Sequence, residues 1–165
     1  MNKPTTMKKI LLPLVILFSS FLTCAQQTFQ SDVVICDTIS QSNPTVWTSC
    51  FENNSIRLEY MFTDCDPAAG FDFEGVLIKV TNLTTVKLDV SWHKLLYYAG
   101  TCRTCDFPEE YRFEFCIGPD ESIEGDCSAQ SGYNFKLFSK FIDQQYSKGD
   151  KLTQFQLGDI IIAEK

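Results

Sequence analysis

The chain has 165 residues, of which 44% are hydrophobic, and its 14 basic and 21 acidic side chains give a net charge of −7 at pH 7. This acidic balance argues against a protein that binds nucleic acid or anionic lipid, because phosphate groups attract lysine and arginine. The length suffices for one domain with an ordinary hydrophobic core.

The N-terminus has the pattern of a secretory signal peptide. Lys3, Lys8 and Lys9 precede an uninterrupted apolar run over 10–18. That run is shorter than the roughly 20 apolar residues that a membrane span needs. We therefore predict a cleaved signal peptide over 1–25, followed by one exported domain without a membrane span, located in the periplasm, on the cell surface or outside the cell.

The cleavage site has two possible forms. Small residues at Thr23 and Ala25 favour ordinary cleavage after Ala25. The alternative is a lipoprotein signal in which Cys24 carries the acyl chains. Phe21 and Thr23 depart from the usual residues at their places in lipoprotein signals, so ordinary cleavage is the preferred prediction.

The rest of the chain is dominated by period-two alternation of apolar and polar side chains. The clearest run places Val86, Leu88, Val90 and Trp92 on one face of a strand, opposite polar neighbours that include His93. Such alternation predicts strands with one buried face. The predicted strands are 32–38, 45–50, 55–62, 76–81, 86–93, 111–117, 134–141 and 155–163.

Seven or eight short strands separated by turn residues predict an all-β fold, an antiparallel β-sandwich that is immunoglobulin-like or jelly-roll-like. A small barrel would give the same signals. Aromatic residues are 13% of the chain, and we expect most of them to fill the space between two sheets.

The cysteines predict that disulfides staple this domain. Export to an oxidising compartment makes disulfides the default, and the odd number of cysteines beyond the leader leaves at least one thiol free or paired with another chain. We expect Cys127 to pair with Cys116 or with one of the two cysteines of the Cys-x-x-Cys motif, and we expect the Cys116 sulfur on the outer side of its sheet. The disulfide candidates are Cys36, Cys50, Cys65, Cys102, Cys105, Cys116 and Cys127.

The Cys102-Arg103-Thr104-Cys105 motif has the spacing of a thiol-disulfide oxidoreductase. The flanking sequence predicts no helix start, and nearby acidic residues would raise a thiolate's pKa. We therefore favour structural cysteines, each bonded to a different strand, and keep a thiol-redox function as an alternative. A zinc site that adds Cys116 and Cys127 is a weaker alternative, because their spacing is not that of a zinc knuckle.

Two further features of the sequence resemble chemical sites: an acidic stretch and the single histidine. The stretch from Asp64 to Glu74 has aspartates spaced as in a calcium loop, but alanines stand where two ligand-loop positions fall, so a solvated acidic turn is preferred. His93 is the only histidine, and alternation predicts that it is exposed. The sequence has no motif of a catalytic or cofactor site, and we expect neither catalysis nor a cofactor.

Three aromatic residues bracket the cysteine motif outside regular alternation: Tyr97, Tyr98 and Phe107. On a rigid loop they could form a ligand platform that stacks on a sugar or anchors a protein. We therefore expect a small exported binding or structural module for a protein or glycan partner. The alternatives are an exported redox protein or enzyme that uses Cys102 and Cys105, and an envelope protein anchored by lipid on Cys24.

Overall fold

The computed structural model describes residues 28–38, 44–66, 72–128, 134–143, 145, 149 and 151–165. The predicted leader, including Cys24, lies outside this part of the chain. Within it every regular element is a β-strand, and no helix is present that could cross a membrane.

One five-stranded sheet contains the two ends of the described chain. All its strand pairs are antiparallel, and its order is β1-β10-β5, with β6 and β7 both pairing with β5. Its strands are β1 (Thr28–Thr38), β5 (Leu88–Tyr98), β6 (Thr101–Cys102), β7 (Arg112–Ile117) and β10 (Leu152–Glu164).

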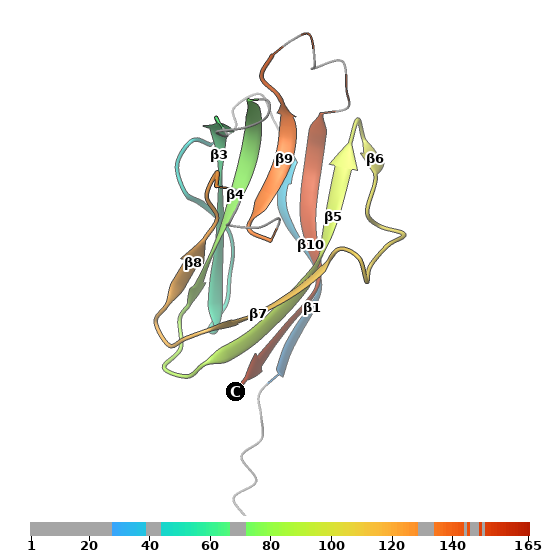
Figure 1. Cartoon of the computed structure of the whole chain (residues 1–165). Coiled ribbons are helices and arrows are strands. Elements are labelled where there is room, and N and C mark those ends of the chain that lie inside the picture. The colour runs from blue at the N-terminus through green and yellow to red at the C-terminus, as the bar shows by residue number, and fades with distance from the viewer. Residues whose placement is uncertain are drawn as a thin grey trace, which may run out of the picture.

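The second five-stranded sheet is also antiparallel and has the order β2-β3-β4, with β8 and β9 both pairing with β4. The two sheets form two layers (Figure 1). The strands of this sheet are β2 (Thr48–Glu52), β3 (Ile56–Cys65), β4 (Phe73–Asn82), β8 (Ser122–Glu124) and β9 (Lys136–Phe141).

The predicted all-β class and antiparallel pairing are confirmed, and each predicted strand overlaps an observed one. The described residues form ten strands instead of the predicted seven or eight. The two that were missed are β6, with 2 residues, and β8, with 3 residues. Strands this short give no repeated alternation, so no pattern in the sequence marks them.

The core lies between the two sheets, which gives the fold a sandwich-like form. Alternation predicted the buried face of β3 correctly, since Ile56 and Leu58 are fully buried and alternate with more exposed neighbours. Tyr60 on β3 packs edge-on against Phe155 on β10, with ring centroids 5.5 Å apart, and so joins the two sheets. Aromatic pairs of this kind add about 1 kcal/mol beyond the burial of their area.

Three disulfides staple the described chain. Cys36–Cys50 links β1 to β2 and so joins the two sheets, whereas Cys102–Cys105 closes a short loop after β6. The third, Cys65–Cys127, links the end of β3 to the segment after β8. Disulfides form and persist in oxidising compartments, so these bonds hint at the kind of environment that exported proteins meet.

The predicted pairing of Cys127 with Cys116, Cys102 or Cys105 is wrong. So is the expectation that Cys102 and Cys105 bond to different strands. Cys127 pairs with Cys65 because β3 and β8 flank β4 on opposite sides, where Gly75 lacks a side chain; a Cβ built there would lie 3.5 Å from the Cys65 sulfur. Cys116 is exposed and is the free cysteine of the described residues.

A glycine after β8 allows two backbone segments to approach closely. The Gly125 amide donates to the carbonyl of Ile78, while the Ile78 amide donates to the carbonyl of Phe135. A Cβ on Gly125 would lie 2.0 Å from that Phe135 oxygen. Any side chain at Gly125 must therefore push the segment before β9 away from β4.

We predict that Gly125→Ala lowers the free energy of unfolding by at least about 2 kcal/mol, because the clash is with backbone that cannot rotate away. Urea denaturation measures this change. The matched control is Gly149→Ala, where a new Cβ meets no atom within 4 Å. The control should stay within about 0.5 kcal/mol of wild type, and equal effects of the two variants would contradict the prediction.

Candidate functional site

A groove opens between the two sheets where β5 changes its neighbour. β7 pairs with β5 from Leu88 to His93, and β6 pairs with it only at Tyr97 and Tyr98. Beside the residues between these two segments lies a cavity of about 460 Å³, bounded on the other side by β9. Figure 1 shows β7 running along one part of β5, with β6 at its far end.

The loop between β6 and β7 occupies the edge of β5 at this point. The amide of Lys94 donates to the Tyr111 carbonyl at 3.1 Å, and the amide of Arg103 donates to the Leu96 carbonyl at 2.8 Å. Thr104 is 2% exposed; its hydroxyl donates to the Lys94 carbonyl at 2.6 Å and accepts from the Leu96 amide at 2.9 Å. These backbone groups of β5 are therefore already hydrogen-bonded.

Aromatic side chains of one sheet line the groove: Tyr98 on β5, and Tyr111 and Phe113 near the start of β7. Phe138 on β9 also borders it, but its ring packs against Phe73 and Phe141. The Tyr98 hydroxyl donates to the carbonyl of Phe138 at 2.7 Å and so bridges the two sheets. Burial raises the pKa of Tyr98 to about 12, with a smaller contribution from Tyr111. Tyr98 therefore stays a neutral hydrogen-bond donor at physiological pH.

Lys94 is the charged side chain most deeply placed in this groove. It is 6% exposed, and its Nζ lies 5.9 Å from the centroid of the Phe113 ring. Burial lowers its pKa from the ordinary 10.5 to about 8. A buried lysine costs stability unless the charge is compensated, and such residues concentrate at functional sites.

The charges along the groove are mostly positive, although the chain is acidic as a whole. Besides Lys94, the lining includes Arg103, Arg112 and Lys136, against one carboxylate, Glu110. The Arg112 guanidinium lies 3.7 Å from Asp159, and the Lys136 ammonium donates to the Ser128 carbonyl at 2.7 Å. Both charges are thus engaged outside the groove, which leaves Lys94 and Arg103 as the cations on its wall. The groove therefore offers positive charge and aromatic surface together.

The sequence carried a signal for Lys94 that our sequence analysis missed. Leu88, Val90 and Trp92 occupy the inward positions of β5, and the same alternation places Lys94 inward. A charged residue at a position that the pattern assigns to the core disfavours folding, so its presence there points to a function. The other cations come from separate segments, which only the fold brings together.

The three residues of the predicted ligand platform lie in different places. Tyr98 lines the groove. Tyr97 points to the opposite face of β5, where its hydroxyl is 3.9 Å from the Cys105 sulfur. Phe107 is 54% exposed in the loop between β6 and β7. The structure therefore brings one of the three into the groove.

The predicted exposure of His93 is wrong. Its side chain is 4% exposed, with Nε2 at 3.2 Å from the carbonyl oxygen of Thr104. The loop closed by Cys102–Cys105 folds over this part of β5 and covers a face that alternation assigned to solvent. His93 lies beside Arg112 of β7, whereas Cys116 lies beside Asp89, so the chain's one histidine is not placed to activate the free thiol.

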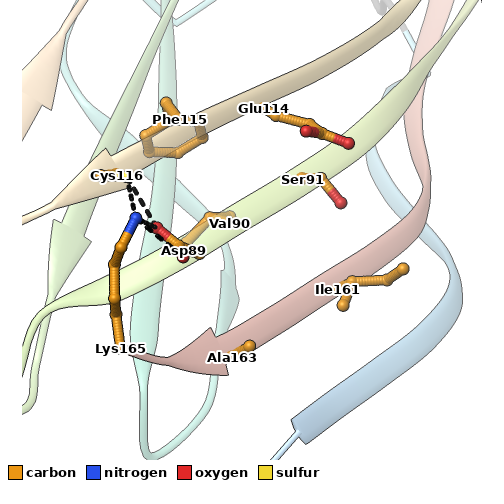
Figure 2. A pocket seen from close by; sticks show the side chains of 9 residues that line it. All are labelled: Asp89, Val90, Ser91, Glu114, Phe115, Cys116, Ile161, Ala163 and Lys165. Carbon is orange, nitrogen blue, oxygen red and sulfur yellow. Dashed lines mark hydrogen bonds and ion pairs between the residues drawn. The ribbon is translucent and has the colours of Figure 1, made fainter.

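A second hollow lies over β5, β7 and β10 and contains Cys116 (Figure 2). The Cys116 thiol donates to a carboxylate oxygen of Asp89 at 2.6 Å, and the Lys165 amine lies 3.3 Å from Asp89 and 3.6 Å from the sulfur. Hydrogen bonds from Cys116 and then from Lys165 lower the pKa of Asp89. The outward position predicted for Cys116 is confirmed.

The two metal sites considered from sequence have no support in the described residues. Three of the four sulfurs of the zinc alternative, those of Cys102, Cys105 and Cys127, are engaged in disulfides and cannot act as thiolate ligands. Residues 67–71 of the calcium stretch lie outside the described residues. The parts of the chain that are described hold no cluster of three or more acidic, histidine or cysteine side chains suited to a metal ion.

Comparison with known proteins finds no family model that matches this chain, and neither the curated proteins nor the solved structures give a match.

We predict that Lys94→Met raises the free energy of unfolding at pH 7 by on the order of 2 kcal/mol, because it removes a desolvated charge. The folded chain releases the Lys94 proton near pH 8, while the unfolded chain holds it to about 10.5. The unfolded state therefore binds more protons between these values, and this lysine makes stability rise with pH there. The advantage of the variant should shrink toward zero above pH 10.5.

Urea denaturation between pH 6 and 11 measures this difference. Lys87→Met, at an exposed lysine, is the control and should change the free energy of unfolding by less than about 0.5 kcal/mol. A Lys94→Met variant that is less stable than wild type at pH 7 would contradict the prediction.

Proposed function

We propose that this protein is an exported, non-catalytic binding module that holds its ligand in the groove between β5 and β9. The observation that carries the proposal is the inward-facing, nearly buried Lys94 on the groove wall. A lysine that faces inward on a cavity wall, with its pKa lowered by burial, is typical of functional sites.

The remaining features of the groove support binding in general. Its volume of about 460 Å³ lies within the usual range of small-ligand sites, roughly 300 to 1,000 Å³. Such sites combine an apolar wall with a few convergent polar groups. Here Tyr98 and Phe113 supply the wall, and Lys94 and Arg103 supply polar groups.

We also infer a β-sandwich of the jelly-roll type rather than of the immunoglobulin type. The immunoglobulin order places the first two strands in one sheet. In this chain β1 and β2 belong to different sheets, and β1 lies beside the last strand, β10. The proposal places the mature protein in the periplasm, on the cell surface or outside the cell, with lipid on Cys24 as the alternative mode of attachment.

If the groove is the binding site, a large side chain that fills it should weaken binding. Labelled protein is applied to an array of neutral and acidic oligosaccharides and to an array of short peptides. Asn134→Trp, a change at the groove lining, should weaken binding of whatever wild type binds by at least about tenfold, because an indole excludes ligand from a cavity of this size.

Thr85→Trp adds the same side chain at an exposed turn and should bind as wild type does. Binding that survives Asn134→Trp would contradict the groove as the site. Absence of binding to every member of both arrays would contradict the proposed function.

A redox function is the second candidate, because Cys102 and Cys105 bond to each other. In such a function this disulfide would accept two electrons and two protons from a substrate dithiol. The two cysteines would become thiols while the substrate formed a disulfide. Neither cysteine lies at a helix N-terminus, the usual means of stabilising the attacking thiolate.

Thiol reactivity distinguishes the two functions. After mild reduction with a dithiol, the Cys102 and Cys105 thiols should alkylate with the rate and pH dependence of ordinary cysteine, because neither lies at a helix N-terminus. Mass spectrometry of alkylated peptides over a pH series gives these rates. A thiol that reacts rapidly well below pH 7 would support the redox function against the binding module.

A further inference from the structure

The groove has the chemistry of a site for one class of ligand. Resting on the binding function proposed above, we propose that its ligand is a carboxylate-bearing saccharide, with the Lys94 ammonium contacting the carboxylate and the groove aromatics contacting the sugar ring. Three observations lead to this assignment: the sign of the charges, the aromatic faces and the occupied strand edge.

The sign of the charges selects an anion. Lys94 and Arg103 line the cavity beside a single carboxylate, that of Glu110. This is a local reversal in a chain of net charge −7. Arg112 and Lys136 also border the cavity, but their charged ends are engaged outside it, at Asp159 and at the Ser128 carbonyl. Cations that converge in a partly desolvated cleft attract an opposite charge more strongly than exposed cations do.

The aromatic side chains select a ligand with apolar faces. Tyr98, Tyr111 and Phe113 line the same cavity as Lys94. A sugar ring has an apolar face that packs on aromatic carbon and hydroxyls that hydrogen-bond at its edge. A bare inorganic anion would use the cations but would leave these rings without contact.

The hydrogen bonding of β5 argues against a peptide that adds a strand. A peptide docked by strand addition pairs with free backbone groups at a sheet edge. The Lys94 and Leu96 amides and carbonyls are already bonded to the loop that contains Arg103, Thr104 and Tyr111. On the opposite wall the Phe138 carbonyl accepts from Tyr98. Recognition in this groove therefore has to come from side chains.

The test compares two probes with the same trisaccharide backbone, trigalacturonic acid and its methyl ester, by isothermal titration calorimetry at low salt. The acid should bind wild type at least tenfold more tightly than the ester, because esterification replaces each carboxylate by a neutral methyl ester. Lys94→Met should lose about tenfold in affinity for the acid and leave affinity for the ester unchanged.

Lys87→Met removes an exposed lysine outside the groove and should bind both probes as wild type does. A thermal melt of each variant establishes that it is folded. Raising the salt concentration should weaken binding of the acid and leave that of the ester unchanged.

The outcomes separate this inference from the function on which it rests. If wild type binds acid and ester equally well and Asn134→Trp weakens both, the carboxylate assignment is overturned, while a groove that binds sugar is supported. Failure of both saccharides, with Lys94-dependent binding of a triglutamate peptide, would overturn the saccharide class and keep the binding function. If neither saccharide nor peptide binds in the groove, both proposals fail.

Discussion

The candidate site depends on the divided edge of β5. This strand pairs with β10 along nearly its whole length on one side, but on the other side β7 covers its first half and β6 only its last two residues. On that second side the stretch from Lys94 to Leu96 has no neighbouring strand, and the loop carrying Thr104 bonds its backbone instead. Buried backbone groups need hydrogen-bond partners, and this loop supplies them to the unpaired stretch of β5. The loop lies along the edge of the strand, so the face of β5 that points toward the other sheet stays open.

Core residues packed beside this opening hold β5, β7 and the segment just before β9 against one another. Trp92, fully buried on β5, contacts Phe113 and Phe115 of β7 and Phe135 just before β9, with ring centroids 5.0 to 6.0 Å apart. Its indole nitrogen has no hydrogen-bond partner among the described residues, a cost that weak contacts with these rings can partly offset. Phe113 belongs both to this cluster and to the groove lining, so the groove wall is an extension of the core.

Much of the architecture could be predicted from the sequence because period-two alternation is a local property. It placed the eight longer strands and identified inward residues such as Leu58 and Trp92. It failed at His93, because burial there comes from a loop that passes over the strand. It also failed for the partner of Cys127, since pairing depends on which strands flank β4, a matter of sheet order and not of spacing along the chain.

The sequence by itself determined an acidic, β-rich domain, an odd number of cysteines beyond the leader and an inward position for Lys94, because composition and alternation are properties of neighbouring residues. Tertiary structure decided that Lys94, Arg103, Phe113 and Leu137 line one cavity. These side chains come from β5, from a loop and from β7 and β9, in two different sheets. Their convergence follows from how the sheets pack, since no spacing along the chain encodes which edges face each other across the core.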